Sequence, residues 1–256
     1  MRLDIYLFSK NYVKSRQKAK TLIEEGNVSV NSKIIKKPSY EMDDSLEYNI
    51  CINDTCPYVS RGGLKLEKMI NELNMDCNNK IAIDIGASTG GFTHCLLMNG
   101  IAKVYAIDSG SNQLHSSLLC NNRVISMENF NAKDLTIDII GERVDIITCD
   151  VSFISQTFII SVAKELICDN GIYVGLIKPQ FEVGKSKIGK GGIVKDPKYR
   201  LEAIKRIFDC ANENGFKCIA FTKSPIVGGD GNIEYVIALS KLGQAISFEK
   251  IKDLYK

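Results

Sequence analysis

The chain has 256 residues, enough for a sizeable core and for one large domain or two smaller ones. An apolar fraction of 45% and a charged fraction of 25% are ordinary for a soluble globular protein. No apolar run approaches the roughly 18 residues of a membrane-spanning helix, which argues against a helical membrane protein.

The amino-terminal stretch and the cysteines indicate a protein that stays in the cytoplasm. The first residues, MRLDIYLFSK, lack the apolar core of a signal peptide. Nine cysteines are scattered singly, no C-x-x-C pair occurs, and Cys51 with Cys56 has no second pair to complete a zinc site. We therefore expect no metal site and interpret the cysteines as small buried hydrophobic residues in a reducing compartment.

Basic residues are concentrated in two segments of a chain whose net charge is only +3. Residues 1–40 carry nine Lys or Arg and three acids, and residues 178–206 again carry nine and three. Such segments indicate local contacts with a polyanion. The alternative is that each segment is simply a solvated face.

Residues 2–24 have the apolar spacing of two short helices, with Ser15 placed to cap the second and Gly26 placed to end it. The segment NVSVNSKIIKKP then predicts two short strands around a polar Asn31-Ser32 turn. A capped helix start among cations, followed by a basic hairpin, suits the phosphates of an RNA backbone. The residues expected to contact RNA here are Arg2, Lys10, Lys14, Ser15, Arg16, Lys18 and Lys20.

This segment also resembles a known module. The pattern RLD…SR..A..LIEEGNVSVN…KKP, over roughly residues 2–50, is similar to the small RNA-binding domain first described in the fourth ribosomal protein of the small subunit. The resemblance implies contact with RNA and no chemistry of its own.

A short joint follows, TCPYVS at residues 55–60, which is too short to be a flexible tether. We expect one domain over residues 1–57 and a second over 60–256. Directly after the joint, an apolar stripe predicts a helix, made of Leu66, Met69, Ile70 and Leu73. Lys65 lies beside this stripe, and the local pattern alone indicates a solvated lysine.

The rest of the chain alternates short apolar runs with helix-length segments. The runs are KIAIDIG, AKVYAID, RVISM, VDIITCD, GIYVGLI, CIAFTKS and EYVIALS. This alternation predicts an α/β fold of the Rossmann-like type, with a doubly wound, mostly parallel sheet. The last two runs predict a hairpin and therefore an antiparallel edge.

The first run leads into IDIGASTGGFT, a glycine-rich turn that differs from the dinucleotide-binding pattern. Asp108 ends the second run, where a carboxylate can accept hydrogen bonds from ribose hydroxyls. Together they favour an adenosine ligand without a pyrophosphate. The alternative is that Asp84 only braces the turn and that the glycines only connect a strand to a helix. The expected cofactor-binding residues are Asp84, Gly86, Ser88, Gly90, Gly91, Asp108 and Asp150.

The chemistry is expected where strands end. Asp150 ends one run and Lys178 ends the next, so both should face one crevice at the carboxyl edge of the sheet. A lysine directly after an apolar strand needs a carboxylate partner, because burying an unpaired ammonium is costly. Asp150 is the expected partner, and Glu234, which starts the last run, could join them. His94 is interpreted as a helix-surface residue, and His115 has no predicted role.

Six motifs in order resemble the TlyA family: VSRGGLKL, IDIGASTGGFT, DVSFIS, IKPQFEVG, GKGGIVKDP and GNIEY. Members of that family are ribosomal RNA ribose 2'-O-methyltransferases, sometimes called hemolysins, with a catalytic part similar to FtsJ-type enzymes. The resemblance implies S-adenosylmethionine as cofactor and ribosomal RNA or a ribosomal subunit as partner. It also implies a catalytic set of Lys65, Asp150, Lys178 and Glu234, with no metal.

In that set Lys178 is expected to remove the proton of the ribose hydroxyl, while Lys65 and Glu234 orient the reacting groups. The basic loop after Lys178 is expected to be mobile and to grip RNA. The RNA contacts of the second domain are then Arg61, Lys185, Lys187 and Lys190. This chain departs from the family pattern at His94, where an acid is usual, at Ser111, where an aromatic residue is usual nearby, and in the looser VGGDGN segment.

The expected target is a cytidine of the large-subunit 23S RNA, with 16S RNA as a further candidate. The short extensions at both ends of the chain resemble the form restricted to the large subunit. Three alternatives are a membrane-active hemolysin, a methyltransferase for a small molecule or another RNA, and a binding protein with a dead catalytic fold. No secretion signal or amphipathic basic helix supports the first, and the intact charged set argues against the third. The leading RNA-binding module argues against a small-molecule substrate and leaves another RNA open.

Overall fold

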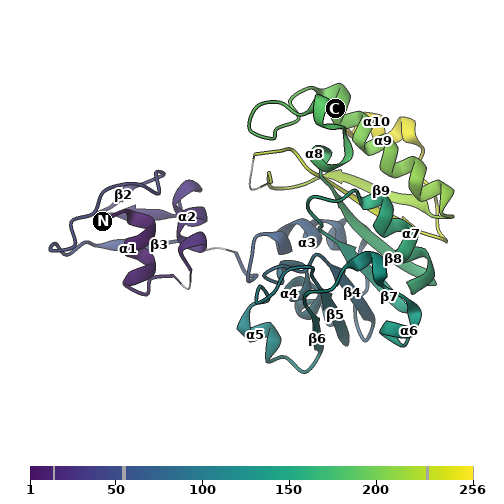
Figure 1. The fold of residues 1–256 in the computed structure, drawn as a ribbon, viewed down its shortest axis with the longest axis horizontal. Helices are drawn as coiled ribbons and strands as arrows, with labels where there is room; N and C mark the ends of the chain where they lie inside the picture. The colour runs from purple at the N-terminus through teal and green to yellow at the C-terminus, as the bar shows by residue number, and fades with distance from the viewer. Residues whose placement is uncertain (14, 54–55, 229–230, 256) are drawn as a thin grey trace. The chain divides into compact units, whose positions relative to one another are not determined.

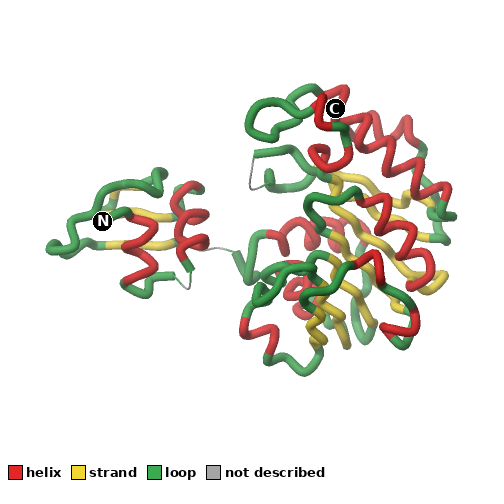
Figure 2. The backbone as a smooth tube through the Cα atoms, viewed as in Figure 1, coloured by secondary structure: helices red, strands yellow, loops and turns green. Residues whose placement is uncertain are grey.

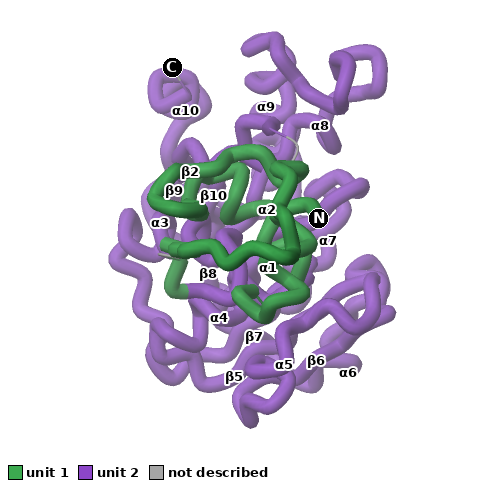
Figure 3. Tube along the Cα trace, turned by 90° about the vertical axis from the view of Figure 1, so that its left-hand side faces the viewer, with its two compact units in different colours: residues 1–57 green, residues 58–256 purple. Residues whose placement is uncertain are grey.

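The computed structural model describes residues 1–13, 15–53, 56–228 and 231–255, so the predicted RNA contact Lys14 lies outside the described residues. The chain divides into two compact units, Met1–Pro57 and Tyr58–Lys256, drawn in different colours in Figure 3. Each unit has its own hydrophobic core. The two units are therefore described separately.

Unit 1 is a pair of helices packed on a small antiparallel sheet. The helices are α1 (Leu3–Ser9) and α2 (Arg16–Glu24), and the strands β1 (Val28–Val30), β2 (Lys33–Ile34) and β3 (Ile50–Ile52) lie in the order β2-β1-β3. The predicted helices and hairpin are confirmed: the Ser15 hydroxyl accepts a hydrogen bond from the Lys18 N–H, and Gly26 ends α2 with a φ of +78°. The third strand was not predicted, because its register is set by pairing with distant β1.

Unit 2 begins with α3 (Gly62–Leu73) and then alternates strands and helices. The strands are β4 (Ile81–Ile85), β5 (Lys103–Ile107), β6 (Val124–Met127), β7 (Val144–Cys149), β8 (Ile167–Ile177), β9 (Lys217–Lys223) and β10 (Tyr235–Ser240). The α-helices are α4 (Gly91–Met98), α5 (Ser116–Leu119), α6 (Ile137–Ile140), α7 (Gln156–Leu166), α8 (Pro179–Glu182), α9 (Pro197–Glu213) and α10 (Phe248–Tyr255). Two short 3-10 helices occupy Ala132–Asp134 and Lys185–Lys187.

The seven strands form one sheet in the order β6-β5-β4-β7-β8-β10-β9, which confirms the predicted doubly wound α/β fold (Figure 1). Strands β4 to β8 are parallel, and β10 runs antiparallel to both β8 and β9. The predicted hairpin is present, but its reversed strand is the inner one, β10, and not the edge strand β9. Because Tyr235 pairs with Ile177, the start of β10 lies at the carboxyl edge of β8.

Helices cover the sheet in two groups (Figure 2). Helices α7, α9 and α10 pack together on the largest core, which contains Ile159, Ile204 and Ile251. Helices α3 and α4 pack against each other, and α3 also contacts β10. Among the described residues, no helix is both long and apolar enough to cross a bilayer.

Candidate active site

Asp150 and Lys178 form an ion pair at the carboxyl edge of the sheet. Asp150 follows β7 and Lys178 follows β8, and these strands are neighbours in parallel register. Lys178 Nζ lies 2.6 Å from Asp150 Oδ1 and donates a hydrogen bond of 2.9 Å to Ser152 Oγ. The ion pair and the hydrogen bond together fix the position of the nitrogen.

Lys65 and Glu234 form a second pair beside the first. Lys65 Nζ lies 2.6 Å from Glu234 Oε2 and 3.9 Å from Asp150 Oδ2, so Asp150 links the two pairs. Burial raises the pKa of the Glu234 carboxyl, and the ammonium of Lys65 partly opposes this shift. Lys65 is only 8% exposed, so the interpretation as a solvated lysine was wrong. The structure brings together four charged groups that are distant in the sequence.

The helix start that carries Lys65 is anchored by packing. Tyr58 is buried, its hydroxyl donates to Glu67 Oε1 at 2.7 Å, and its ring lies where a Cβ on Gly63 would approach to 2.4 Å. The Val59 N–H donates to His94 Nδ1 at 3.1 Å, and burial lowers the pKa of that imidazole. His94 is therefore a half-buried residue of α4 that also accepts a hydrogen bond from the chain before α3.

Two cavities meet at the charged cluster. The larger, about 490 Å³, is lined by four of the predicted cofactor residues: Gly86, Ser88, Asp108 and Asp150. The smaller, about 230 Å³, is lined by Gly91 together with Lys65 and Lys178. The cavities share Gly86, Ser88, Asp150 and Ser152. A ligand in the larger cavity would thus reach the ammonium groups in the smaller one.

The walls of the larger cavity suit a nucleoside. Asp108 accepts hydrogen bonds from the backbone N–H groups of Ser88 and Gly110, at 2.8 and 2.7 Å, which hold its carboxylate in place. A carboxylate has further lone pairs, so Asp108 can still accept from two ribose hydroxyls. Gly86 has a φ of +79°, and a Cβ there would lie 2.6 Å from the Asp150 carbonyl oxygen. This residue must therefore be glycine for the turn to close over the cavity.

The other two predicted cofactor residues lie outside both cavity linings of the described chain. Asp84 is fully buried, accepts hydrogen bonds from the hydroxyls of Thr93 and Thr148, and has its pKa raised to about 6 by burial. Gly90 has a φ of +93°, and a Cβ there would meet Leu118 at 2.2 Å. The geometry of these two residues fits the alternative in which they brace the turn.

The predicted RNA contacts of unit 1 occupy different environments. Arg2 and Arg16 both bind Asp4, whereas Lys10 pairs with Asp44 and Lys20 with Glu24. Ser15 caps α2 through Lys18, as already described.

In unit 2, Arg61 directly precedes α3, and Lys185 and Lys190 are exposed. Lys187 pairs with Glu202, so its charge is compensated. The end of this basic loop is not loose: Asn232 accepts from the Val194 N–H and donates to the Gly192 carbonyl, both at 2.9 Å. The expectation of a mobile loop therefore holds at most for its first half.

Sequence reasoning assigned no role to Ser152, Phe153 or Asn232. Phe153 is 93% exposed, has a φ of +64° and lines the larger cavity. A phenylalanine in the left-handed region is uncommon and is maintained only by its surroundings. The exposure of Phe153 could not be predicted from the sequence, because a phenylalanine is normally expected in the hydrophobic core.

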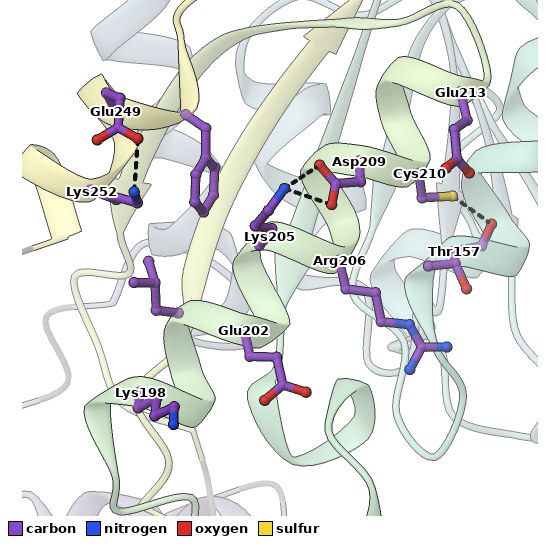
Figure 4. Close-up of a pocket in the computed structure, with 12 residues that line it drawn as sticks. Thr157, Lys198, Glu202, Lys205, Arg206, Asp209, Cys210, Glu213, Glu249 and Lys252 are labelled. Carbon is purple, nitrogen blue, oxygen red and sulfur yellow. Dashed lines mark hydrogen bonds and ion pairs between the residues drawn. The ribbon is translucent and has the colours of Figure 1, made fainter.

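A larger cavity lies elsewhere in unit 2. It measures about 1030 Å³ and is an open groove along α9 and α10, lined by Thr157, Phe248 and four acids interleaved with four basic side chains. Figure 4 shows Lys205 paired with Asp209 and Lys252 paired with Glu249 across this surface. These pairs compensate part of the charge that lines the groove. In the part of the chain that the structure describes, no group of three or more His, Cys, Asp or Glu could hold a metal.

Comparison with known proteins agrees with this geometry. Residues 58–241 match the FtsJ-like methyltransferase family, and residues 1–46 match the S4 domain. The chain is 44% identical to Hemolysin A of Brachyspira hyodysenteriae over 241 residues, covering 92% of this chain and 98% of that relative. It is 37% identical over 253 residues to the 23S rRNA (cytidine-2'-O)-methyltransferase TlyA of Campylobacter jejuni, covering 92% and 97%.

A solved structure of a proposed hemolysin from Streptococcus thermophilus superposes with a TM-score of 0.79 at 36% identity, covering 100% of this chain and 94% of that one. The fold, the order of domains and the near full-length identity agree with one another. The chain belongs to the TlyA and Hemolysin A family of FtsJ-like methyltransferases with an amino-terminal S4 domain.

Proposed function

We propose that this methyltransferase transfers a methyl group from S-adenosylmethionine to a ribose 2'-hydroxyl of ribosomal RNA, with a cytidine of 23S RNA as the expected target. The observation that carries the proposal is the linked cluster of Lys178, Asp150, Lys65 and Glu234 where the two cavities meet. A ribose hydroxyl is a poor nucleophile until its proton is transferred, and a positioned amine can accept that proton.

The residues of the larger cavity would hold the cofactor. Asp108 would accept from the ribose hydroxyls, and the turn from Gly86 to Ser88 would let the adenosyl group approach the backbone. When bound, S-adenosylmethionine supplies an electrophilic methyl group on a positively charged sulfur. Asp150 lines both cavities, so its carboxylate would face both the methyl donor and the ribose.

Lys178 would act as the base and Lys65 as an orienting cation. In its neutral form, Lys178 Nζ would accept the proton of the 2'-hydroxyl as that oxygen replaces the sulfur on the methyl carbon and the carbon–sulfur bond breaks. Asp150 keeps that nitrogen in place, and Glu234 keeps Lys65 extended toward the smaller cavity. Much of the rate enhancement would come from alignment of the reacting atoms, because preorganised geometry removes an entropic cost.

The ring of Phe153 offers a support for the target nucleotide. It lies on the rim of the larger cavity, 5.1 Å from the ring of Phe181. An exposed aromatic ring can stack on a base that has left its helical stack. The S4 domain and the exposed Lys185 and Lys190 would then hold the surrounding backbone.

Mapping of 2'-O-methyl groups in ribosomal RNA tests the proposal. RNA from cells with the gene, without it, and with a Lys178→Ala variant is compared at every position. We expect one or a few cytidine positions to lose the methyl group in the second and third samples. Identical maps in all three samples would contradict the proposed substrate, whereas a lost methyl group in 16S RNA alone would redirect it to the small subunit.

A further inference from the structure

Unit 1 contains a charged cluster that differs from the other ion pairs on its surface. The carboxylate of Asp4, in α1, accepts hydrogen bonds from Arg2 Nε at 2.9 Å, Arg2 Nη2 at 3.3 Å and Arg16 Nε at 2.8 Å. Asp4 is only 2% exposed, whereas the side chains of Arg2 and Arg16 are 43% and 53% exposed. One buried anion therefore holds two exposed cations.

This arrangement is more than is needed to neutralise a buried carboxylate. One arginine would satisfy Asp4, and the second leaves the three groups with a net charge of +1. Burial alone would raise the pKa of the Asp4 carboxyl, but the hydrogen bonds and charges of the two guanidiniums outweigh it and hold that pKa below its usual value. The carboxylate therefore stays ionised and keeps both guanidiniums bound near neutral pH.

The neighbouring lysines are arranged differently. Lys10 pairs with Asp44 at 3.2 Å and Lys20 with Glu24 at 3.9 Å, and all four side chains are about half exposed. These are pairs of one cation with one anion, screened by water, and worth little to binding or stability. The Arg2 and Arg16 cluster thus combines two exposed cations with a fixed geometry, while the nearby Glu41 carboxylate offsets part of the charge of Arg2.

The N–H groups of Arg2 and Arg16 that do not bind Asp4 can donate hydrogen bonds to phosphate oxygens. Arg2 and Arg16 both use the Nε edge toward Asp4, and within the described residues their other N–H groups have no protein acceptor. A guanidinium presents its donors in a planar fork that matches phosphate, and a fork held in place loses less entropy on binding. Arg16 is also the first residue of α2, where the helix dipole adds positive potential.

We propose that Asp4 is a positioning residue that holds Arg2 and Arg16 as a rigid two-arginine site for RNA backbone phosphates. The inference rests on the proposed RNA substrate and adds a role for an acidic residue at the RNA-binding surface. Acidic residues normally weaken binding to a polyanion by repulsion. At this position the carboxylate strengthens binding, because the order it imposes on two arginines outweighs its own charge.

The decisive experiment compares two variants that each remove one negative charge. Asp4→Asn removes the buried carboxylate, and Glu24→Gln removes an exposed one in the same unit. Binding of the full-length protein to ribosomal RNA from cells that lack the gene is measured at several salt concentrations. We expect about tenfold weaker binding for Asp4→Asn and unchanged or tighter binding for Glu24→Gln. Asp4→Asn that binds as tightly as Glu24→Gln would overturn the proposal.

A second variant protects the test against misfolding. Arg16→Lys keeps the charge and can still pair with Asp4, but it lacks the planar fork. We expect weaker RNA binding with an unchanged salt dependence, and a raised KM for RNA at unchanged cofactor affinity. Equal binding by Arg16→Lys and the parent protein would contradict the role of the fork. A parent protein that neither binds nor methylates ribosomal RNA would instead refute the proposed function.

Discussion

The two charged clusters of this protein, one in each unit, are built in opposite ways. In unit 1, Arg2, Asp4 and Arg16 lie close together in the chain, and the cations face water. In unit 2, Lys65, Asp150, Lys178 and Glu234 come from four distant elements, and each side chain is at most 20% exposed. Binding a polymer needs exposed charge, which local sequence can supply. A reaction at a hydroxyl group needs charged side chains that are shielded from water. Such side chains are brought together by the folded sheet.

The largest effect is expected at the inner cluster. Lys178→Ala should lower the methylation rate by about a thousandfold, because it removes the proposed base. Lys178→Arg is the matched variant, since arginine keeps a positive charge next to Asp150 but does not become neutral at ordinary pH. We expect both variants to bind cofactor and to be inactive in a single-turnover methylation assay. An active Lys178→Arg would show that this position supplies only charge.

The second comparison concerns the stability of a buried and an exposed ion pair. Glu234→Ala should lower the free energy of unfolding by about 3 kcal/mol, because Lys65 is left buried without its nearest partner. Asp209→Asn, which breaks the exposed pair with Lys205, should change it by less than about 0.5 kcal/mol. Urea unfolding measures both values. The double variant Lys65→Met, Glu234→Ala should regain part of the lost free energy of unfolding, because it leaves no unpaired ammonium. A double variant that is much less stable than Glu234→Ala would contradict this account.

The pH dependence of stability should differ between the buried carboxyls of the two units. Burial raises the pKa of Asp84 to about 6, so the folded state binds its proton more tightly than the unfolded state does. Stability from this group therefore rises as pH falls from about 6 to 4, by on the order of 2 kcal/mol. The pKa of the Asp4 carboxyl is lowered in the folded state. The stabilisation that this group gives is therefore present at pH values above its ordinary pKa, and it is lost as the pH falls below that value.

Urea unfolding at several pH values, with Asp84→Asn and Asp4→Asn as the variants, separates the two contributions. Asp84→Asn should remove the gain in stability between pH 6 and 4, and Asp4→Asn should reduce the loss below about pH 4. Identical pH profiles for Asp84→Asn and the parent protein would show that this carboxyl is not the group that titrates.

The smallest effect is expected at the basic loop. The double variant Lys185→Ala, Lys190→Ala should reduce the slope of log affinity for RNA against log salt by about one to two units, because each lysine neutralises about one phosphate. Lys187→Ala is the matched control, since Glu202 already compensates this lysine and the slope should change less. A slope unaffected by the double variant would favour the alternative of a solvated loop.

Much of the fold was predictable from local patterns. The seven apolar runs, the capped second helix and the hairpin of unit 1 are all present, because period, capping and turn residues act over a few neighbouring positions. The position of β10 inside the sheet was not predictable, since a hairpin pattern does not reveal which of its strands pairs with β8. That pairing places Glu234 at the carboxyl edge of the sheet, beside Lys65.

The kinds of group in the site were readable from local sequence patterns: the glycine turn, the acid after β5, and lysines and carboxylates at strand ends. The environment of Lys65, in contrast, depends on long-range packing. On its helix it reads as a solvated side chain, but packing of Tyr58 under Gly63 places it beside Glu234 and Asp150. Burial and ion pairing depend on residues that are distant in the chain. These two factors set the chemical behaviour of a charged side chain, so a local sequence pattern does not reveal it.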